Sequence, residues 1–295
     1  MSSSLKKFII SISLFSVILF GYFVVILIVN VITNNRILID QKKNILIVGD
    51  SGLGSSLDDD MMKSAKNICQ NSEPYYLTFF KIKFLISKNY TPDTLIIGFG
   101  NHNISNYNDY KLKDEFWKNR LFNSNYLFFK EIIKIKKLNI DYLRLFSVYV
   151  RNMCIIPKNN HYQNFMGKFN GLKGHQEKNE SEKIIDRIYY YKDHGVSEVC
   201  ISYLDSIIDI SVKNKITPIL VSAPVSESYY KLIPKLIKDR YCVIKKKYLD
   251  LGIKIIDYSI SSYDDKYFFN ADHLNIKGAI KFTEEVKTKL SQNTE

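Results

Sequence analysis

The stretch that decides the fold reads Asn44-Ile45-Leu46-Ile47-Val48-Gly49-Asp50-Ser51. Four branched apolar residues follow one another and stop at a Gly-Asp-Ser turn, which is typical of a strand buried on both faces of a parallel sheet. We therefore expect Ser51 at the carboxyl end of the sheet, in the first turn of a helix, where open α/β sheets carry their sites. A serine there is a candidate nucleophile if a base reaches it, and is otherwise a helix cap.

The candidate base lies near the other end of the chain, in the segment Asn270-Ala271-Asp272-His273-Leu274. Asp272 and His273 stand in a polar loop just before a helical pattern over residues 279–290. Histidine can take the proton of a serine nucleophile, and a carboxylate can hold its imidazole ring in the right orientation. The sequence therefore pairs Ser51 with His273, far apart in the chain.

These blocks together resemble the SGNH, or GDSL-like, hydrolase superfamily. A third match is Gly98-Phe99-Gly100-Asn101, and a fourth, fainter one is Asn67-Ile68-Cys69-Gln70-Asn71-Ser72, where the family usually carries glycine near Ser72. The resemblance implies a serine–histidine mechanism on ester bonds, with no metal or organic cofactor. It also implies oxyanion donors at the N–H of Ser51, the N–H near Ser72 and the side-chain amide of Asn101. Asn103 is an alternative to Asn101, because the turn can be aligned in two ways.

The last block departs from the family pattern, which usually reads Asp-x-x-His. Asn270 stands three residues before His273. An asparagine in the orienting position can hold the wrong imidazole tautomer, which cost about 10⁴ in rate in a serine protease. Asp272 is then the candidate orienting acid, although neighbours in sequence seldom orient each other's side chains well.

Strand and helix patterns alternate over residues 44–295, which we read as one hydrolase-like domain. Strands are expected at residues 44–49, 94–98, 216–221 and 253–258, and helices at residues 55–66, 75–87, 196–214 and 229–251. The predicted class is therefore α/β, a three-layer α/β/α fold with a parallel, flavodoxin-like sheet. Residues 104–195 hold an insertion of unclear role, with a long polar loop over residues 158–182.

The amino-terminal region predicts one transmembrane helix. Residues 8–29 carry no charge, and a helix of that length rises about 33 Å, enough for a hydrocarbon core of roughly 30 Å. We expect a tail at residues 1–7, the span at residues 8–32 and a linker at residues 33–43. No small-residue cleavage pattern follows the apolar run, so a retained membrane anchor is expected, with the larger domain outside the cytoplasm.

Composition narrows the possible partners. Hydrophobic residues make up 46% of the 295 residues, which excludes a disordered chain, and the formal net charge is +12. The lysines are scattered without a basic block or a nucleic-acid motif, so we do not expect a nucleic-acid partner. The four cysteines have no zinc-site spacing, so no metal site is expected.

The sequence thus predicts a membrane-anchored SGNH-like serine esterase or O-acyltransferase. Its substrate would be an acylated carbohydrate or another ester, such as the acetyl groups of a cell-surface polysaccharide. The alternative is a catalytically weak or inactive domain of the same type, which binds glycan or scaffolds an envelope complex. Asn270 is the feature that favours this alternative.

Overall fold

The computed structural model describes residues 2–34, 39–155, 165–175, 181–190, 195–260 and 263–292. Its centre is a five-stranded parallel sheet in the order β2-β1-β3-β4-β5. The strands are β1 (Ile45–Val48), β2 (Ala65–Asn67), β3 (Thr94–Gly98), β4 (Thr217–Ser222) and β5 (Lys254–Asp257). The four predicted strands are confirmed to within one residue at each end, and the predicted α/β class is confirmed.

The sheet is buried on both faces because its side chains alternate between two cores. The first core receives Leu46, Val48, Leu95, Ile97 and Leu220. The second core receives Ile47, Ile96, Ile219, Val221 and Ile256. Because both faces need apolar side chains, each central strand is a continuous apolar run.

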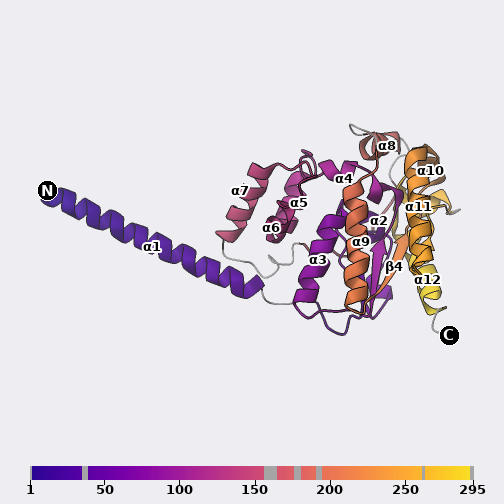
Figure 1. Cartoon of the computed structure of the whole chain (residues 1–295), viewed down its shortest axis with the longest axis horizontal. Coiled ribbons are helices and arrows are strands. Elements are labelled where there is room, and N and C mark those ends of the chain that lie inside the picture. Colours follow the sequence, from indigo (N-terminus) through magenta and orange to yellow (C-terminus); the bar gives the residue numbers. More distant parts are fainter. Residues whose placement is uncertain are drawn as a thin grey trace.

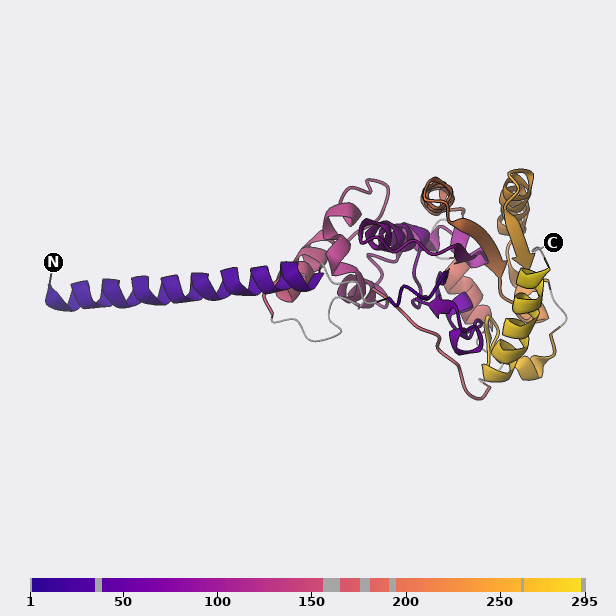
Figure 2. The ribbon, with the colours of Figure 1, turned by 90° about the horizontal axis from the view of Figure 1, so that it is seen from below.

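Helices cover both faces and complete the three layers (Figure 1; Figure 2). The first core is closed by α3 (Tyr75–Ser87), α9 (Glu198–Lys213) and α11 (Lys235–Asp250). The second core is closed by α2 (Ser51–Gly54) and α12 (Ile276–Ser291), through side chains such as Leu53 and Phe282. The first helix of the predicted domain, α2, and its last helix, α12, therefore lie on the same face of the sheet.

The helix predicted over residues 55–66 is wrong. Its residues form a short 3-10 helix, Asp59–Met61, and then enter β2 at the edge of the sheet. The Asp58 side chain caps the 3-10 helix, and Asp59 Oδ2 accepts hydrogen bonds from the backbone N–H of Asn67 and from Lys66 Nζ, both at 3.1 Å. The acidic residues thus hold a chain reversal rather than start a long helix.

The single helix predicted over residues 229–251 is also wrong, since it is two helices. Helix α10 spans Glu227–Leu232, and α11 begins only after Pro234. Proline has no N–H and forces the preceding residue away from helical angles, and Ile233 accordingly has a ψ of 129°. Pro234 is therefore the sequence signal for the break.

Residues 104–195 add a helical layer beside the sheet. Its helices are α4 (Tyr107–Tyr110), α5 (Lys118–Asn125), α6 (Phe129–Ile132), α7 (Tyr142–Met153) and α8 (Ser181–Tyr189). The polar loop predicted over residues 158–182 lies partly outside the described residues, and residues 165–175 contain no helix or strand. There the N–H of Gly167 donates to the carbonyl of Ile68 at 3.1 Å, and a Cβ on Gly167 would lie 1.5 Å from the carbonyl oxygen of Cys69. Only glycine allows this close crossing of the sheet edge.

Helix α1 (Ser3–Asn34) projects away from the rest of the molecule (Figure 1; Figure 2). Residues Ser3–Thr33 are long and apolar enough to cross a membrane, and they contain the predicted span. Near its carboxyl end the buried Asn30 donates from Nδ2 to the carbonyls of Met153 at 3.1 Å and Ile155 at 3.3 Å. The predicted linker, residues 33–43, lies partly outside the described residues.

Candidate active site

Ser51 begins helix α2 directly after β1. Gly49 makes the turn with a φ of +142°, and a Cβ on it would lie 3.3 Å from the backbone of Gly98 in the neighbouring strand. Asp50 caps α2, since its Oδ1 accepts a hydrogen bond from the N–H of Gly52 at 3.0 Å. Gly49 thus allows the close strand packing, Asp50 supplies the helix cap, and Ser51 supplies the hydroxyl.

His273 reaches Ser51 from the carboxyl-terminal side of the sheet. It lies in β7 (His273–Leu274), which pairs with β6 (Phe268–Asn270) immediately before α12. Its Nε2 lies 2.8 Å from Ser51 Oγ, across 222 positions of sequence. Asn275 fixes this approach, because its Oδ1 caps α12 and its Nδ2 donates to the carbonyl of Lys266 at 2.7 Å.

Asp272 contacts the other nitrogen of the same ring. Its Oδ1 lies 2.7 Å from His273 Nδ1, and Asn270 Oδ1 lies 3.1 Å from that nitrogen. Asp272, the candidate orienting acid, thus contacts His273 although the two are neighbours in sequence, and the β6–β7 hairpin in which they lie is irregular. Serine, histidine and carboxylate thus form one continuous chain of hydrogen bonds.

Asp272 and His273 shift each other's pKa values. Burial alone would lower the pKa of His273, but the charge and hydrogen bond of Asp272 outweigh it, and the pKa of His273 is raised above its ordinary value. Burial would raise the pKa of Asp272, but the charge and hydrogen bond of His273 lower it. The carboxylate therefore stabilises the protonated ring that forms when His273 accepts a proton.

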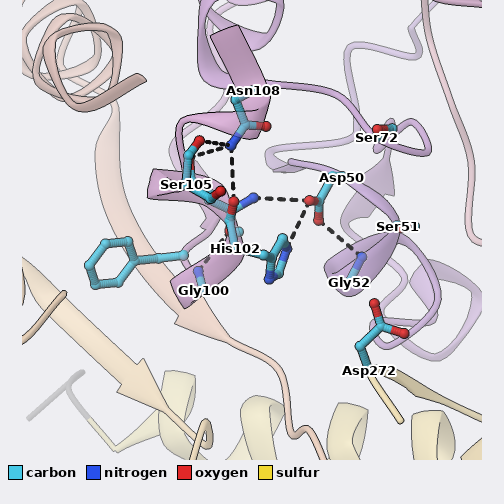
Figure 3. Close-up of polar contacts among 12 residues, drawn as sticks. Asp50, Ser51, Gly52, Ser72, Gly100, His102, Ser105, Asn108 and Asp272 are labelled. Atoms are coloured by element: carbon cyan, nitrogen blue, oxygen red, sulfur yellow. Dashed lines mark hydrogen bonds and ion pairs between the residues drawn. The ribbon is translucent and has the colours of Figure 1, made fainter. Parts of the chain in front are cut away.

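Asp50 organises a second network beside Ser51 (Figure 3). Its Oδ2 lies 2.8 Å from His102 Nε2 and accepts from Asn103 Nδ2 at 3.0 Å. Burial would raise the pKa of Asp50, but the charge and hydrogen bond of His102 lower it strongly. The His102 ring is three-quarters buried, and its hydrogen bond to Asp50 agrees with the sequence-based interpretation of His102 as a polar loop residue whose hydrogen bonds are satisfied.

The two asparagines considered as oxyanion donors are placed differently. Asn103 is bound on both sides, since its Oδ1 also accepts from the N–H of Gly100 at 2.7 Å. Asn101 is buried, and its Oδ1 has no hydrogen-bond partner within the described residues. Asn101 lines a small cavity behind His102, and neither amide lines the cleft that contains Ser51 and His273. The roles of Asn101 and Asn103 remain predictions, and His102 is the residue of this turn that faces the cleft.

Ser72 lies at the opposite rim of the cleft in the left-handed backbone region, with a φ of +63°. Glycine adopts this region without strain, which explains why glycine is usual at the corresponding place in the family that the sequence resembles. The carbonyl of Ser72 accepts a hydrogen bond from Lys111 Nζ at 3.2 Å. Lys111 thus holds the strained turn in place.

The cleft has a volume of about 300 Å³ and is closed on one side by the 104–195 segment. That wall includes Tyr107, Lys111, Phe116, Trp117 and Arg187. Burial lowers the pKa of Lys111 to about 8, against the opposing effect of Asp50. Among the described residues no cluster of histidine, cysteine, aspartate and glutamate is arranged to hold a metal ion. Sequence reasoning missed this wall, because its residues show no shared motif.

The solved structures that are similar to this chain include two lipases. A GDSL-like lipase from Bacteroides thetaiotaomicron has a TM-score of 0.42 and 11% identity, over 86% of this chain and 91% of its own. A lipase/acylhydrolase from Enterococcus faecalis has a TM-score of 0.39 and 13% identity, over 84% and 95%. No family model and no curated protein matches the chain. We therefore base the function on the geometry of the site itself.

Proposed function

We propose that the protein is a serine esterase or O-acyltransferase that acts on ester bonds. One observation carries the proposal: Ser51 Oγ lies 2.8 Å from His273 Nε2, and His273 Nδ1 lies 2.7 Å from Asp272. A nucleophile, a base and an orienting carboxylate within hydrogen-bond reach are the parts that acyl transfer needs.

The proposed reaction begins when Ser51 Oγ attacks the carbonyl carbon of the ester. Its proton passes to His273 Nε2, while the proton on Nδ1 remains hydrogen-bonded to Asp272. The Asp272 carboxylate stabilises the positively charged ring. The same Nε2–H then protonates the leaving alkoxide as the ester C–O bond breaks, which leaves an acyl group on Ser51. Water or an acceptor hydroxyl attacks this acyl-enzyme by the same route.

The negative oxygen of the tetrahedral intermediate needs hydrogen-bond donors. We assign this role to the backbone N–H of Ser51 and the N–H at Ser72, with the Asn101 amide as a third, less well-placed candidate. Loss of one such donor typically costs roughly 100- to 1000-fold in rate. The polar groups around Asp50 support the Gly49-Asp50-Ser51 turn, from which the first of these donors comes.

We further propose that α1 anchors the enzyme in a membrane, with the domain outside the cytoplasm. The length and apolar composition of α1 support this, as does α7, on which Leu143 and Phe146 are exposed and whose last residue, Met153, bonds α1. Resistance to alkaline carbonate extraction and cleavage by protease added to intact cells are the expected results. Protection of the domain until lysis would reverse the orientation.

The acetyl groups of a cell-surface polysaccharide remain the substrate that we propose for an anchored enzyme of this kind. The alternative, an inactive glycan-binding domain, was favoured by Asn270. The 2.7 Å contact between Asp272 and His273 weakens that reasoning, because a carboxylate already occupies the orienting position.

A fluorophosphonate probe tests the proposal on the purified full-length protein. Ser51→Ala is expected to abolish labelling and His273→Ala to reduce it strongly, because the serine is weak without its base. Ser55→Ala is the matched control, since Ser55 lies one turn further along and bonds only the carbonyl of Ser51 through its hydroxyl. A folded wild-type protein that takes up no label and cleaves no acetyl ester would contradict the proposal and leave the binding alternative.

A further inference from the structure

The cleft at Ser51 continues into a second cavity. This neighbour has a volume of about 400 Å³, and the two share Asn71 and Asn170 as lining residues. The second cavity runs between the 165–175 segment and α5, through residues such as Gln70 and Ser124. The two cavities therefore adjoin at these residues, and together they form the groove that extends from Ser51 to Arg120 and Lys168.

Four cationic side chains line this groove. Lys111 and Arg187 face the part at Ser51, and Arg120 and Lys168 face the second cavity. Within the described part of the chain, none of the four forms an ion pair with a carboxylate; Lys111 bonds the carbonyl of Ser72, and Arg187 lies over the ring of Phe116 at 5.9 Å.

The carboxylates of the groove are already engaged. Asp50 is bound to His102 and Asn103, and Asp272 is bound to His273. The lining therefore carries four cationic side chains against two carboxylates, and the second cavity carries Arg120 and Lys168 with no carboxylate among its described lining residues.

Lys111 gives the strongest physical reason for an anionic ligand. The residue is only 6% exposed, and a buried ammonium group is costly unless it is paired with an anion. Lys111 has one carbonyl acceptor at 3.2 Å, and burial lowers its pKa to about 8 although the charge of Asp50 opposes this. An anionic group of a ligand would pair with this ammonium group beside the nucleophile.

We propose that the groove binds a linear anionic oligomer, bearing carboxylate or phosphate groups along its chain, with its acyl ester at Ser51. This inference rests on the proposed function for the position of the ester, and extends it to the substrate class. Arg120 and Lys168 bind the charged units beyond the acylated one, while Lys111 and Arg187 bind the charge nearest to it. Phe116, 69% exposed and in edge contact with Trp117 at 4.8 Å, provides an apolar surface at the same wall.

Binding is measured with the full-length Ser51→Ala protein in detergent, so that no turnover is needed. The ligands are oligogalacturonate for carboxylates, a short polyphosphate for phosphates, and a xylo-oligosaccharide of equal length as the neutral reference. We expect at least about tenfold tighter binding of one anionic ligand than of the neutral one, since several partly exposed charge pairs of about 0.5 kcal/mol each add up to that factor. The arm that binds more tightly identifies carboxylate or phosphate.

Substitution separates the groove from the overall charge of the protein. The pair Arg120→Gln and Arg187→Gln is expected to remove most of the preference for the anion. Arg240→Gln is the control for each single substitution, Arg120→Gln and Arg187→Gln, because it also removes one positive charge, from α11, where Arg240 pairs with Glu198 at 3.0 Å. Equal binding of the anionic and neutral ligands, or equal loss in the Arg240 variant, would overturn the proposal.

The failure of this inference can be told apart from failure of the proposed function. Cleavage of acetyl esters by the wild type, with no anion preference in the Ser51→Ala protein, would reject the anionic substrate and keep the esterase. Anion binding that depends on Arg120 and Arg187, without any ester cleavage or probe labelling, would keep the groove and reject the esterase.

Discussion

The two walls of the cleft were built in different ways. One wall comes from the parallel sheet and its end loops, and contributes Ser51, Asp272 and His273. The other comes from the 104–195 segment, and contributes Lys111, Phe116 and Arg187. The first wall contains the reacting groups, held in short hydrogen bonds, whereas the second wall presents cations without ion pairs among the described residues and an exposed ring. We therefore expect variants of the first wall to affect the reaction step and variants of the second wall to affect substrate binding.

The largest effect is expected on the first wall. Asp272→Asn should lower kcat by about 10⁴, because it removes the charge that stabilises the His273 ring and favours the wrong tautomer. His273 acts as a base only when neutral, so kcat/KM should rise with pH as His273 loses its proton. Because the pKa of His273 is raised, this rise should occur above the ordinary histidine value of about 6.5. Without Asp272, burial is the main effect on the pKa of His273 and lowers it, so the rise should move to lower pH.

The matched variant for that measurement is Asn270→Asp. It adds a carboxylate 3.1 Å from Nδ1, where Asp272 is already bound, and should change kcat by less than about tenfold, on the scale of one hydrogen bond. A rate gain far larger than this, together with an unchanged rate in Asp272→Asn, would make Asn270 the orienting position and contradict the role assigned to Asp272.

The next effect concerns stability beneath the first wall. Glu73 and Lys81 form a fully buried pair at 2.5 Å just below the Ser72 turn. Lys81→Met should lower the free energy of unfolding by about 3–5 kcal/mol in urea denaturation, because it leaves a buried carboxylate without its partner. Lys118→Met should lower the free energy of unfolding much less, because the ion pairs that it breaks in the second wall are more exposed. Equal losses would mean that the two walls do not differ in this way.

A smaller effect is expected from the second wall. Phe116→Ala should raise KM for an acylated oligosaccharide about fivefold, because the loss of one contact residue typically removes about 1 kcal/mol of binding free energy. The pH at which kcat/KM rises should stay where it is, because Phe116 makes no contact with His273. Tyr142→Ala on α7, another exposed aromatic residue that is not among the cleft-lining residues, is the control. A displaced pH profile in Phe116→Ala would place that ring in the chemistry.

The smallest effect lies where the walls meet, at Ser72. Ser72→Gly should raise the free energy of unfolding by up to about 1 kcal/mol, because a φ of +63° strains serine by more than glycine loses in chain entropy. Asn89→Gly, at a φ of +59°, should change stability less, since asparagine tolerates this region. Calorimetry measures both. A loss of stability in Ser72→Gly would show that the serine side chain matters more than its backbone.

The sheet and the positions of its ends could be predicted from sequence because their signals are local. Continuous apolar runs specify strands buried on both faces, and the Gly49-Asp50-Ser51 turn can only follow such a strand at its carboxyl end. The helix at residues 55–66 was mispredicted because an acidic start suits a helix and a 3-10 turn equally well. The break at Pro234 was readable from the sequence and was overlooked, since proline excludes a continuous helix there.

Four of the five strands, their parallel arrangement and the two loops that contain Ser51 and His273 could thus be predicted from the sequence, because each depends on residue types within a few positions. Only the tertiary structure decided how Asp272 reaches His273, why Ser72 is strained, and that Lys111, Arg120, Lys168 and Arg187 line one groove. Those relations depend on a strand pairing with an irregular register and on packing between segments distant in the chain. No local pattern encodes them, because side chains that meet across the fold leave no common spacing in the sequence.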